Sequence, residues 1–303
     1  MQAPTKPGTQ MFHADPILVA KCETKRLLSG LGLMSSARTT FDIYRKLRYF
    51  NSTRFSITVG QTPITFVTED QRSKWFFHYR YRQGELHERA VTLELTSRLK
   101  SARVFADVGA HLGYFACIAG AFNRGLKVFC FEMNHNLIET IRKNLAENRI
   151  SGAEIVNRPV SDRRKLVHYE RISTDPGLSM TEARGQAVDA DRHAGTETIT
   201  LDEFFAERGV VPDLMKIDVQ GAEMQALRGA RRIIRERHPA IFLEVHPKLM
   251  AGFGDRARDL YRFLKEQRYS IHRFSDHRST QASLVEVEPN GELPAGTHML
   301  LCV

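Results

Sequence analysis

The sequence predicts an α/β fold in which helices cover both faces of a mostly parallel sheet. Two short apolar runs, residues 103–107 and 128–132, each end in an acidic residue. Between them a glycine-bearing turn, residues 107–113, leads into residues 114–122, which are small and apolar enough for a buried helix. Strand, glycine turn, helix, strand and acid in this order are typical of the nucleotide-binding half of a doubly wound sheet.

The composition is that of an ordinary globular protein. With 303 residues, 42% of them hydrophobic and 26% charged, the chain can bury one large core, with or without an extension. No apolar run approaches the roughly 20 residues that cross a bilayer, and the polar residues 1–10 predict no signal peptide. The cysteines show no metal-ligand spacing and lie mostly in apolar runs, so we expect reduced core residues of a cytoplasmic protein.

The net charge of +9 and the isoelectric point near 9.5 raise the question of a nucleic-acid or anionic lipid partner. The arginines are spread along the chain, and no nucleic-acid recognition motif accompanies them. We therefore expect no nucleic-acid partner. The charge indicates either an anionic acceptor or simply a basic surface.

Residues 1–100 are predicted to form an α+β extension ahead of the main domain, residues 101–303. The basic helix of this extension either packs on the main domain or contacts a membrane surface or a partner. The aromatic-rich segment either fills a core or lines a substrate cleft. The expected parts are a disordered tail, the basic helix, a β-hairpin, the aromatic segment and a second helix, at residues 1–15, 35–50, 54–68, 75–81 and 85–99.

The remaining elements of the main domain alternate between strands and helices. Asn134 is a suitable N-cap for the helix after the second strand. Residues 171–197 lack periodicity, and a loop of this length inside a compact domain is typical of a lid that orders when a ligand binds. The expected strands are 154–157, 165–170, 198–201, 213–218, 240–245, 269–274 and 298–303, and the expected helices are 136–148, 202–208, 222–236 and 256–267.

The turn after the first strand favours S-adenosylmethionine over a phosphate-bearing cofactor. Gly109 lets the chain turn sharply off the strand, and Gly113 permits the close approach of a ligand or a helix. Asp107 would repel a phosphate at the helix N-terminus, where most nucleotide folds bind one. Glu132, at the tip of the second strand, can accept hydrogen bonds from both ribose hydroxyls. NAD fits less well, because the third glycine of the G-x-G-x-x-G pattern is missing.

Four motifs together resemble the FkbM family of S-adenosylmethionine-dependent methyltransferases: DVGAHLG, FEM, IDVQGAEMQALRGA and FLEVHP. The resemblance spans about residues 85–274. It implies a Rossmann-like seven-stranded methyltransferase sheet with helices on both faces, in which the last strand is antiparallel between its neighbours. Two positions depart from the usual pattern of the family, which has Asn in place of His111 and Glu in place of Gln220.

The resemblance also implies S-adenosylmethionine as the cofactor. The loop after the third strand would pass the adenine, where Asp162 either accepts a hydrogen bond from the exocyclic amine or serves only as a turn residue. Glu85 or Glu88, in the helix before the first strand, would be close enough to reach the cofactor. The residues expected to bind it are Asp107, Gly109, Ala110, His111, Gly113, Tyr114, Glu132, Met133, Ser161 and Asp162.

The expected catalytic residues follow two neighbouring strands. Lys216 and Asp218 share one face of the first strand, and Glu244 and His246 share one face of the second. We expect His246 or Asp218 to act as the base, with Glu244 orienting the imidazole or the acceptor. Lys216 either stabilises a developing alkoxide or pairs with an acid, and Glu223 either starts a helix or takes part in catalysis. A metal could be held by Asp218, Glu244 and His246, but no ligand spacing requires one, so none is expected.

Members of the family mostly methylate hydroxyls. The resemblance therefore implies O-methylation of a sugar, a glycan or a small natural-product metabolite. Two alternatives stay open. The basic charge balance suggests an RNA methyltransferase, and the departures at His111 and Gln220 suggest a non-catalytic binding protein on a retained fold.

Overall fold

The computed structural model describes residues 47–81, 84–170, 181–182, 193–279, 282–288, 291 and 293–303. The predicted tail 1–15 and nearly all of the predicted basic helix 35–50 lie outside these residues. Ser52–Val303 forms one compact unit. The part of the predicted extension that follows Ser52 therefore belongs to the same unit as the main sheet. No helix among the described residues is both long enough and apolar enough to cross a membrane.

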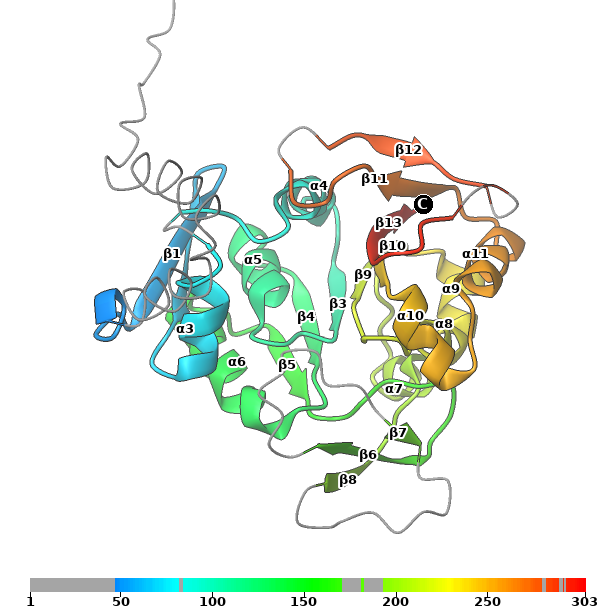
Figure 1. Ribbon diagram of the computed structural model, residues 1–303, viewed down its shortest axis with the longest axis horizontal. Coiled ribbons are helices and arrows are strands. Elements are labelled where there is room, and N and C mark those ends of the chain that lie inside the picture. Colours follow the sequence, from blue (N-terminus) through cyan, green and yellow to red (C-terminus); the bar gives the residue numbers. More distant parts are fainter. Residues whose placement is uncertain are drawn as a thin grey trace, which may run out of the picture. The chain divides into compact units, whose positions relative to one another are not determined.

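The centre of this unit is an eight-stranded sheet with the strand order β12-β11-β13-β10-β9-β3-β4-β5 (Figure 1). The strand β13 runs antiparallel between β10 and β11, as predicted. The α/β fold class and the antiparallel position of the last strand are thus confirmed, but the sheet has eight strands and not the expected seven, because β12 adds to its edge. The strands are β3 Val104–Val108, β4 Lys127–Phe131, β5 Ala153–Val156, β9 Leu214–Ile217, β10 Ala240–Val245, β11 Ile271–Phe274, β12 Leu284–Glu286 and β13 His298–Cys302.

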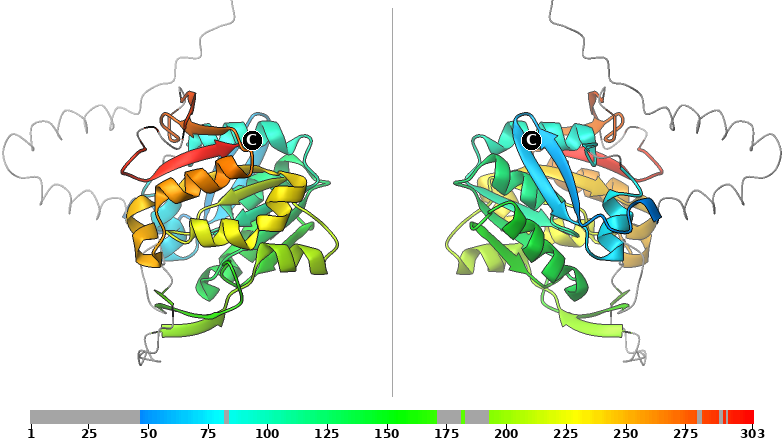
Figure 2. Two further views of the ribbon diagram at one scale, coloured as in Figure 1. Left: turned by 90° about the vertical axis from the view of Figure 1, so that its right-hand side faces the viewer. Right: turned by 90° about the vertical axis from the view of Figure 1, so that its left-hand side faces the viewer.

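Helices cover both faces of the sheet, and each face has its own apolar core. On β3, Phe105 points into the core beneath α4, α5 and α6, whereas Ala106 and Val108 point into the core beneath α7, α8, α9 and α11. The two panels of Figure 2 look onto these opposite sides. The helices are α4 Arg89–Leu99, α5 Tyr114–Phe122, α6 His135–Glu147, α7 Leu201–Glu207, α8 Glu223–Gly229, α9 Arg231–Arg237, α10 Pro247–Met250 and α11 Ala257–Glu266.

The predicted hairpin is present as β1, Arg54–Val59, and β2, Thr62–Val67. It packs on α5 and α6, where the amide oxygens of Asn144 and Asn148 accept hydrogen bonds from the backbone of β2. The first three residues of the aromatic segment end the short helix α3, Gln71–Phe77, and the rest follow it. Most of its rings fill the core, as one of the two interpretations expected, but Trp75 is 45% exposed.

Two of the expected elements differ from the sequence prediction. The single helix expected over 222–236 is two helices, because the distant carboxylate of Asp202 accepts from Arg232 N and Ile233 N and so caps a new helix, α9. The strand expected at 198–201 is reduced to a bridge between Ile199 and Val160. The side chain of Thr200 instead caps α7.

The expected additional strand at 165–170 is present as β6, Leu166–Glu170. It lies at the centre of a separate antiparallel sheet with β7, Thr181–Glu182, and β8, His193–Glu197. Residues 171–180 and 183–192, which make up most of the predicted lid, lie outside the described residues.

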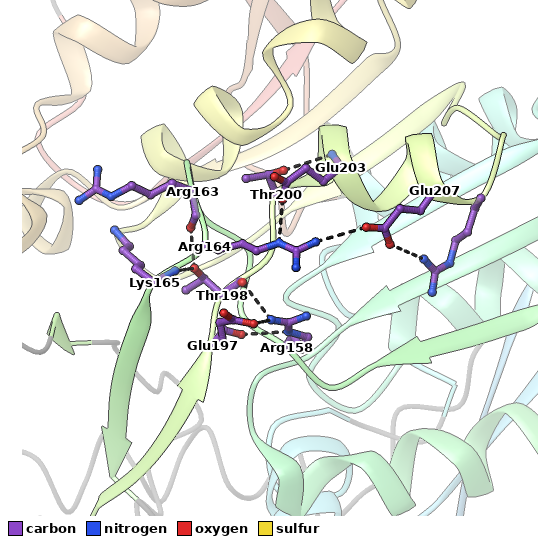
Figure 3. A network of polar contacts seen from close by, with 10 residues as sticks. Arg158, Arg163, Arg164, Lys165, Glu197, Thr198, Thr200, Glu203 and Glu207 are labelled. Carbon is purple, nitrogen blue, oxygen red and sulfur yellow. Dashed lines mark hydrogen bonds and ion pairs between the residues drawn. The ribbon is translucent and has the colours of Figure 1, made fainter.

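Ion pairs connect the small sheet with its surroundings (Figure 3). Arg164, just before β6, pairs with Glu203 and Glu207 of α7 at 3.1 and 3.2 Å. Arg158 pairs with Glu197 of β8 and also donates to its carbonyl oxygen at 3.1 Å. Exposed pairs of this kind stabilise a fold by only about 0–1 kcal/mol each. Their main consequence is to orient β8 relative to the loop that carries Arg158.

Candidate active site

A pocket opens at the carboxyl ends of β3, β4, β5 and β9, the edge at which open α/β sheets bind their ligands. The loops after these four strands form its walls. Among its lining residues, Gly109, Glu132 and Met133 were expected to bind the cofactor, and Asp218 was expected to be catalytic. The lining consists of Val108, Gly109, Phe131, Glu132, Met133, Asn134, Leu137, Arg158, Pro159, Val160, Asp218, Val219 and Gln220.

The turn after β3 packs backbone to backbone against the turn after β9. The amides of Gly109 and Ala110 both donate to the carbonyl of Phe131, at 2.9 Å each. Gly109 has a φ of +86°, and a Cβ at this position would lie 1.8 Å from the carbonyl oxygen of Asp218. Only glycine therefore allows the turn after β3 and the turn after β9 to lie so close together.

Replacing Gly109 by Ala is expected to destabilise the fold by about 3 kcal/mol or more, because the rigid backbone at Asp218 cannot yield to the added methyl. Urea unfolding followed by circular dichroism measures the loss. Gly209→Ala is a matched control, because Gly209 also has a positive φ, +62°, but a Cβ there meets nothing within 4 Å. Equal losses in the two variants would contradict the close approach and leave only the cost of the positive φ.

Glu132 is held in a fixed orientation at the pocket wall. Its two carboxylate oxygens accept hydrogen bonds from the amides of His111, at 2.7 Å, and Asn134, at 2.8 Å. Each carboxylate oxygen has two acceptor sites, so one site on each oxygen remains for a ligand. Burial raises the pKa of Glu132 to about 7, although the two amide hydrogen bonds act in the opposite direction.

Asp107 lies behind the pocket rather than in its wall. It is 1% exposed, and its carboxylate accepts a hydrogen bond from Ala116 N at 3.0 Å, in the first turn of α5. Burial raises its pKa to about 6. A carboxylate at this helix N-terminus occupies the place where a phosphate would bind in other nucleotide folds.

The other expected cofactor residues lie farther from the pocket. Gly113 packs on Ile141, and the ring of Tyr114 stacks on Phe66 in the core, 5.3 Å between centroids. Ser161 is fully buried and donates to Gln225 at 2.9 Å.

Asp162 pairs with Lys165 at 3.4 Å and with Arg163 at 3.2 Å. In this segment of the chain it is Arg158, Pro159 and Val160 that line the pocket. The sequence analysis missed these three residues, and their position directly after the third strand was the available signal.

The four expected catalytic residues lie together at the ends of β9 and β10. The ammonium group of Lys216 lies 3.6 Å from Asp218, and Nε2 of His246 lies 4.0 Å from the same carboxylate. Glu244 shares a hydrogen bond with Asp218. Only Asp218 among them is appreciably exposed, at 22% for its side chain, so it faces the pocket while the others lie behind it.

The imidazole of His246 is oriented by Glu223, not by Glu244. Nδ1 of His246 lies 2.8 Å from Glu223, and the same carboxylate oxygen accepts from Gly221 N at 2.8 Å. Glu223 is completely buried. From the sequence, Glu223 either starts a helix or takes part in catalysis. In the structure Glu223 lies in the first turn of α8, where it accepts from Gly221 N, and it also contacts the imidazole of His246. It therefore belongs to the helix start and orients His246 as well.

The charges of this cluster depend strongly on one another. Burial and the neighbouring Asp218 raise the pKa of Glu244 to about 10, so these two carboxyl groups share one proton near neutral pH. Burial acts to raise the pKa of Asp218, but Lys216 and the hydrogen bonds outweigh it and lower that pKa. Burial acts to lower the pKa of His246, but Glu223 and Asp218 outweigh it and raise that pKa.

Two groups of side chains in this region have the composition and spacing of metal ligands. One comprises Asp218, Glu244 and His246, and the other comprises Glu88, Glu244 and His277. In each group the candidate ligand atoms lie within 4.8 Å of one another. The first group is the one that the sequence offered as a possible metal site, although no ligand spacing required one and none was expected; the second group was not predicted.

Comparisons with known proteins return methyltransferases, at low identity. A methyltransferase FkbM from Methylobacillus flagellatus KT is 17% identical, with a TM-score of 0.42, over 67% of this chain and 44% of that one. An S-adenosylmethionine-dependent methyltransferase from Agrobacterium tumefaciens is 9% identical, with a TM-score of 0.44, over 83% of this chain and 70% of that one.

A precorrin-6y C5,15-methyltransferase from Geobacter metallireducens GS-15 is 12% identical, with a TM-score of 0.39, over 70% of this chain and 87% of that one. The chain spans less than half of the length of the methyltransferase FkbM from Methylobacillus flagellatus KT. A search among curated proteins found no match.

The model of the methyltransferase FkbM domain matches residues 107–271. The match begins at Asp107, near the end of β3, and extends beyond the strand that carries Glu244. It covers more than half of the chain, and the resemblance carried by the four sequence motifs is confirmed. The protein therefore belongs to the FkbM methyltransferase domain family.

Proposed function

We propose that this protein is an S-adenosylmethionine-dependent methyltransferase that methylates a hydroxyl oxygen of a carbohydrate or a small natural-product metabolite. The observation that carries the proposal is that Glu132 and Asp218 line the same pocket, with a carboxylate-oriented imidazole, His246, next to Asp218. Membership of the FkbM family supports the reaction type. The acceptor class rests on the resemblance and on the base that a hydroxyl acceptor requires.

On the cofactor side, the residues of the pocket fit an adenosine without phosphates. Glu132 offers one acceptor site on each oxygen, which suits a pair of ribose hydroxyls. Asp107 caps α5 and leaves no site for a phosphate there. When bound, S-adenosylmethionine supplies a methyl group activated by a positively charged sulfonium. The anionic Asp218 in the pocket wall favours that charge.

On the acceptor side, His246 has the properties of a general base. Glu223 holds the proton of His246 at Nδ1, which leaves Nε2 as the acceptor on the side of Asp218. Nε2 of His246 would take the proton that the acceptor oxygen loses when its new bond to the methyl carbon replaces the bond from that carbon to sulfur, with S-adenosylhomocysteine as the leaving group. Glu223 and Asp218 raise the pKa of His246 against the effect of burial, which makes Nε2 a stronger proton acceptor. The ion pair of Lys216 and Asp218 sets the charge around His246 and would orient the acceptor oxygen.

Two experiments test the proposal. Calorimetry measures the binding of S-adenosylhomocysteine, and a second assay follows the transfer of a labelled methyl group from S-adenosylmethionine to panels of hydroxylated sugars, small natural products and RNA. We expect micromolar binding and label in a sugar or small-metabolite acceptor, at an oxygen. Label in RNA alone would show that the acceptor is RNA and not a sugar or a small metabolite. Binding of the cofactor product without transfer to any acceptor would favour a non-catalytic binding protein, and absence of binding would contradict the cofactor site.

A further inference from the structure

Glu88, Glu244 and His277 form a cluster next to the His246 site. They come from distant parts of the chain: Glu88 precedes α4, Glu244 belongs to β10, and His277 follows β11. One ligand atom from each lies within 4.8 Å of the others. Two carboxylates and one imidazole that converge in this way have the composition of a divalent metal site.

The cluster contains buried polar atoms that lack partners. Glu88 is 4% exposed, and its Oε2 has no hydrogen-bond partner among the described residues. The other oxygen of Glu88 lies 3.4 Å from Nε2 of His87. The Nε2 atom of His277 is also buried without a partner among the described residues. Buried polar atoms without partners cost free energy, so two of them in one cluster of metal-ligating side chains indicate a missing ligand.

The backbone holds the cluster in place. Ala90 N donates to the carbonyl of His277 at 3.1 Å, which ties the segment after β11 to the start of α4. Glu88 has a φ of +42°, a conformation that is unfavourable for a side chain with a Cβ. This strained residue is fixed by Thr92 N, which donates to the carbonyl of Glu88 at 2.9 Å.

The second group, Asp218, Glu244 and His246, is less suited to a metal because its atoms already have partners. Nδ1 of His246 lies 2.8 Å from Glu223. Asp218 accepts from Gln220 at 2.9 Å and lies 3.6 Å from the ammonium group of Lys216. A cation would have to displace these partners, whereas Glu88 and His277 offer free positions.

We propose that Glu88, Glu244 and His277 bind a divalent transition-metal cation, of the Mn²⁺ or Zn²⁺ kind, beside the acceptor site. Imidazole suits Zn²⁺ and related ions, and carboxylates suit Mn²⁺, so the mixed set favours these ions over Ca²⁺ or Mg²⁺. Glu244 belongs to both groups, so the cation lies next to the hydrogen-bonded pair of Glu244 and Asp218. There it holds an oxygen of the acceptor within reach of His246.

The site can be tested without any turnover by titrating the EDTA-treated full-length protein with Mn²⁺. The electron paramagnetic resonance signal of free Mn²⁺ reports how much of the ion remains unbound. We expect one Mn²⁺ per chain, competition by Zn²⁺, and at least a tenfold loss of affinity in Glu88→Gln and in His277→Asn. Circular dichroism and the binding of S-adenosylhomocysteine confirm that each variant is folded. Since metal binding is measured directly, failure of this proposal and failure of the methyltransferase proposal are distinguishable.

Matched control variants are available on the same elements. Glu94→Gln removes a carboxylate of α4 that pairs with Arg98 at 3.0 Å, and His272→Asn removes an imidazole of β11. Both are expected to bind Mn²⁺ like the wild type. No binding by the wild type, or equal binding by Glu88→Gln and the controls, would overturn the proposal. Loss of Mn²⁺ in Asp218→Asn but not in Glu88→Gln would assign the cation to the other group and overturn it as well.

Discussion

Replacing His246 by Asn is expected to lower kcat for methyl transfer by about 10²–10⁴-fold, the usual contribution of a positioned general base. The reason is that Nε2 of His246 is the nitrogen left open for the acceptor proton, since Nδ1 is engaged by Glu223 at 2.8 Å. The affinity for S-adenosylhomocysteine should change little, because His246 is not among the residues that line the pocket. Single-turnover transfer of labelled methyl and calorimetry measure the two quantities.

The control for this variant is His238→Asn. His238 stacks on Tyr269 at the end of α9, with 4.0 Å between ring centroids, and its loss should leave kcat unchanged. If His246→Asn retained full kcat, the base would have to be sought elsewhere, with Asp218 as the next candidate. A loss of cofactor binding in His246→Asn would indicate collapse of the site and not loss of a base.

The pH dependence of kcat in Glu223→Gln tests whether Glu223 acts through the imidazole of His246 or has only a structural role. The carboxylate of Glu223 acts to raise the pKa of His246, so its neutral amide should lower that pKa. The base works in its unprotonated form, so the ascending limb of the kcat profile should move to lower pH. A purely structural role of Glu223 would lower activity equally at every pH and leave the limb in place.

The strands that carry the site could be predicted because their signal is local. An apolar run that ends in an acid places Asp107, Glu132 and Asp218 at strand tips, and β10 has the bounds that its apolar pattern predicts. By contrast, β12 consists of three exposed residues at the edge of the sheet, and alternation of buried and exposed positions cannot reveal such a strand.

Features that depend on distant partners could not be predicted from local patterns. The break between α8 and α9 arises because Asp202 supplies a cap from α7. The carboxylate that contacts Nδ1 of His246 comes from the start of another helix. Local patterns favoured Glu244, the acid nearest in sequence, as the group that orients either the imidazole or the acceptor, and only the first of these two roles falls to Glu223 instead. Glu88 and His277 lie in one cluster although they are still farther apart in the sequence, and this depends on how the segment after β11 returns to α4.

Replacing Glu132 by Ala is expected to weaken the binding of S-adenosylhomocysteine by about 1.5–3 kcal/mol, the value of hydrogen bonds to a charged group, or roughly 10–150-fold. The free acceptor sites on its two oxygens are the ones that we assign to the ribose hydroxyls. Calorimetry measures the change. Glu139→Ala is the control, since that residue lies on the exposed face of α6 and pairs with Arg142.

The same carboxyl group makes cofactor affinity depend on pH. Burial raises the pKa of Glu132 to about 7, so the group is largely protonated at pH 6 and largely ionised at pH 8. Only the ionised form can accept from both hydroxyls without giving up an acceptor site to its own proton. The affinity for S-adenosylhomocysteine should therefore rise between pH 6 and pH 8 in the wild type and stay flat over that range in Glu132→Gln.

The stability of the protein should show the opposite trend from the same cause. The folded state keeps the proton of Glu132 up to about pH 7, whereas the unfolded chain loses it near the ordinary value of 4.5. The folded state thus binds more protons between these values, and the contribution of Glu132 to stability falls as pH rises from about 4.5 to 7. Glu132→Gln should lose stability less steeply over this window in urea unfolding. Identical slopes for the variant and the wild type would show that Glu132 is already ionised at pH 5, and the pH dependence of cofactor binding would then have to come from another group.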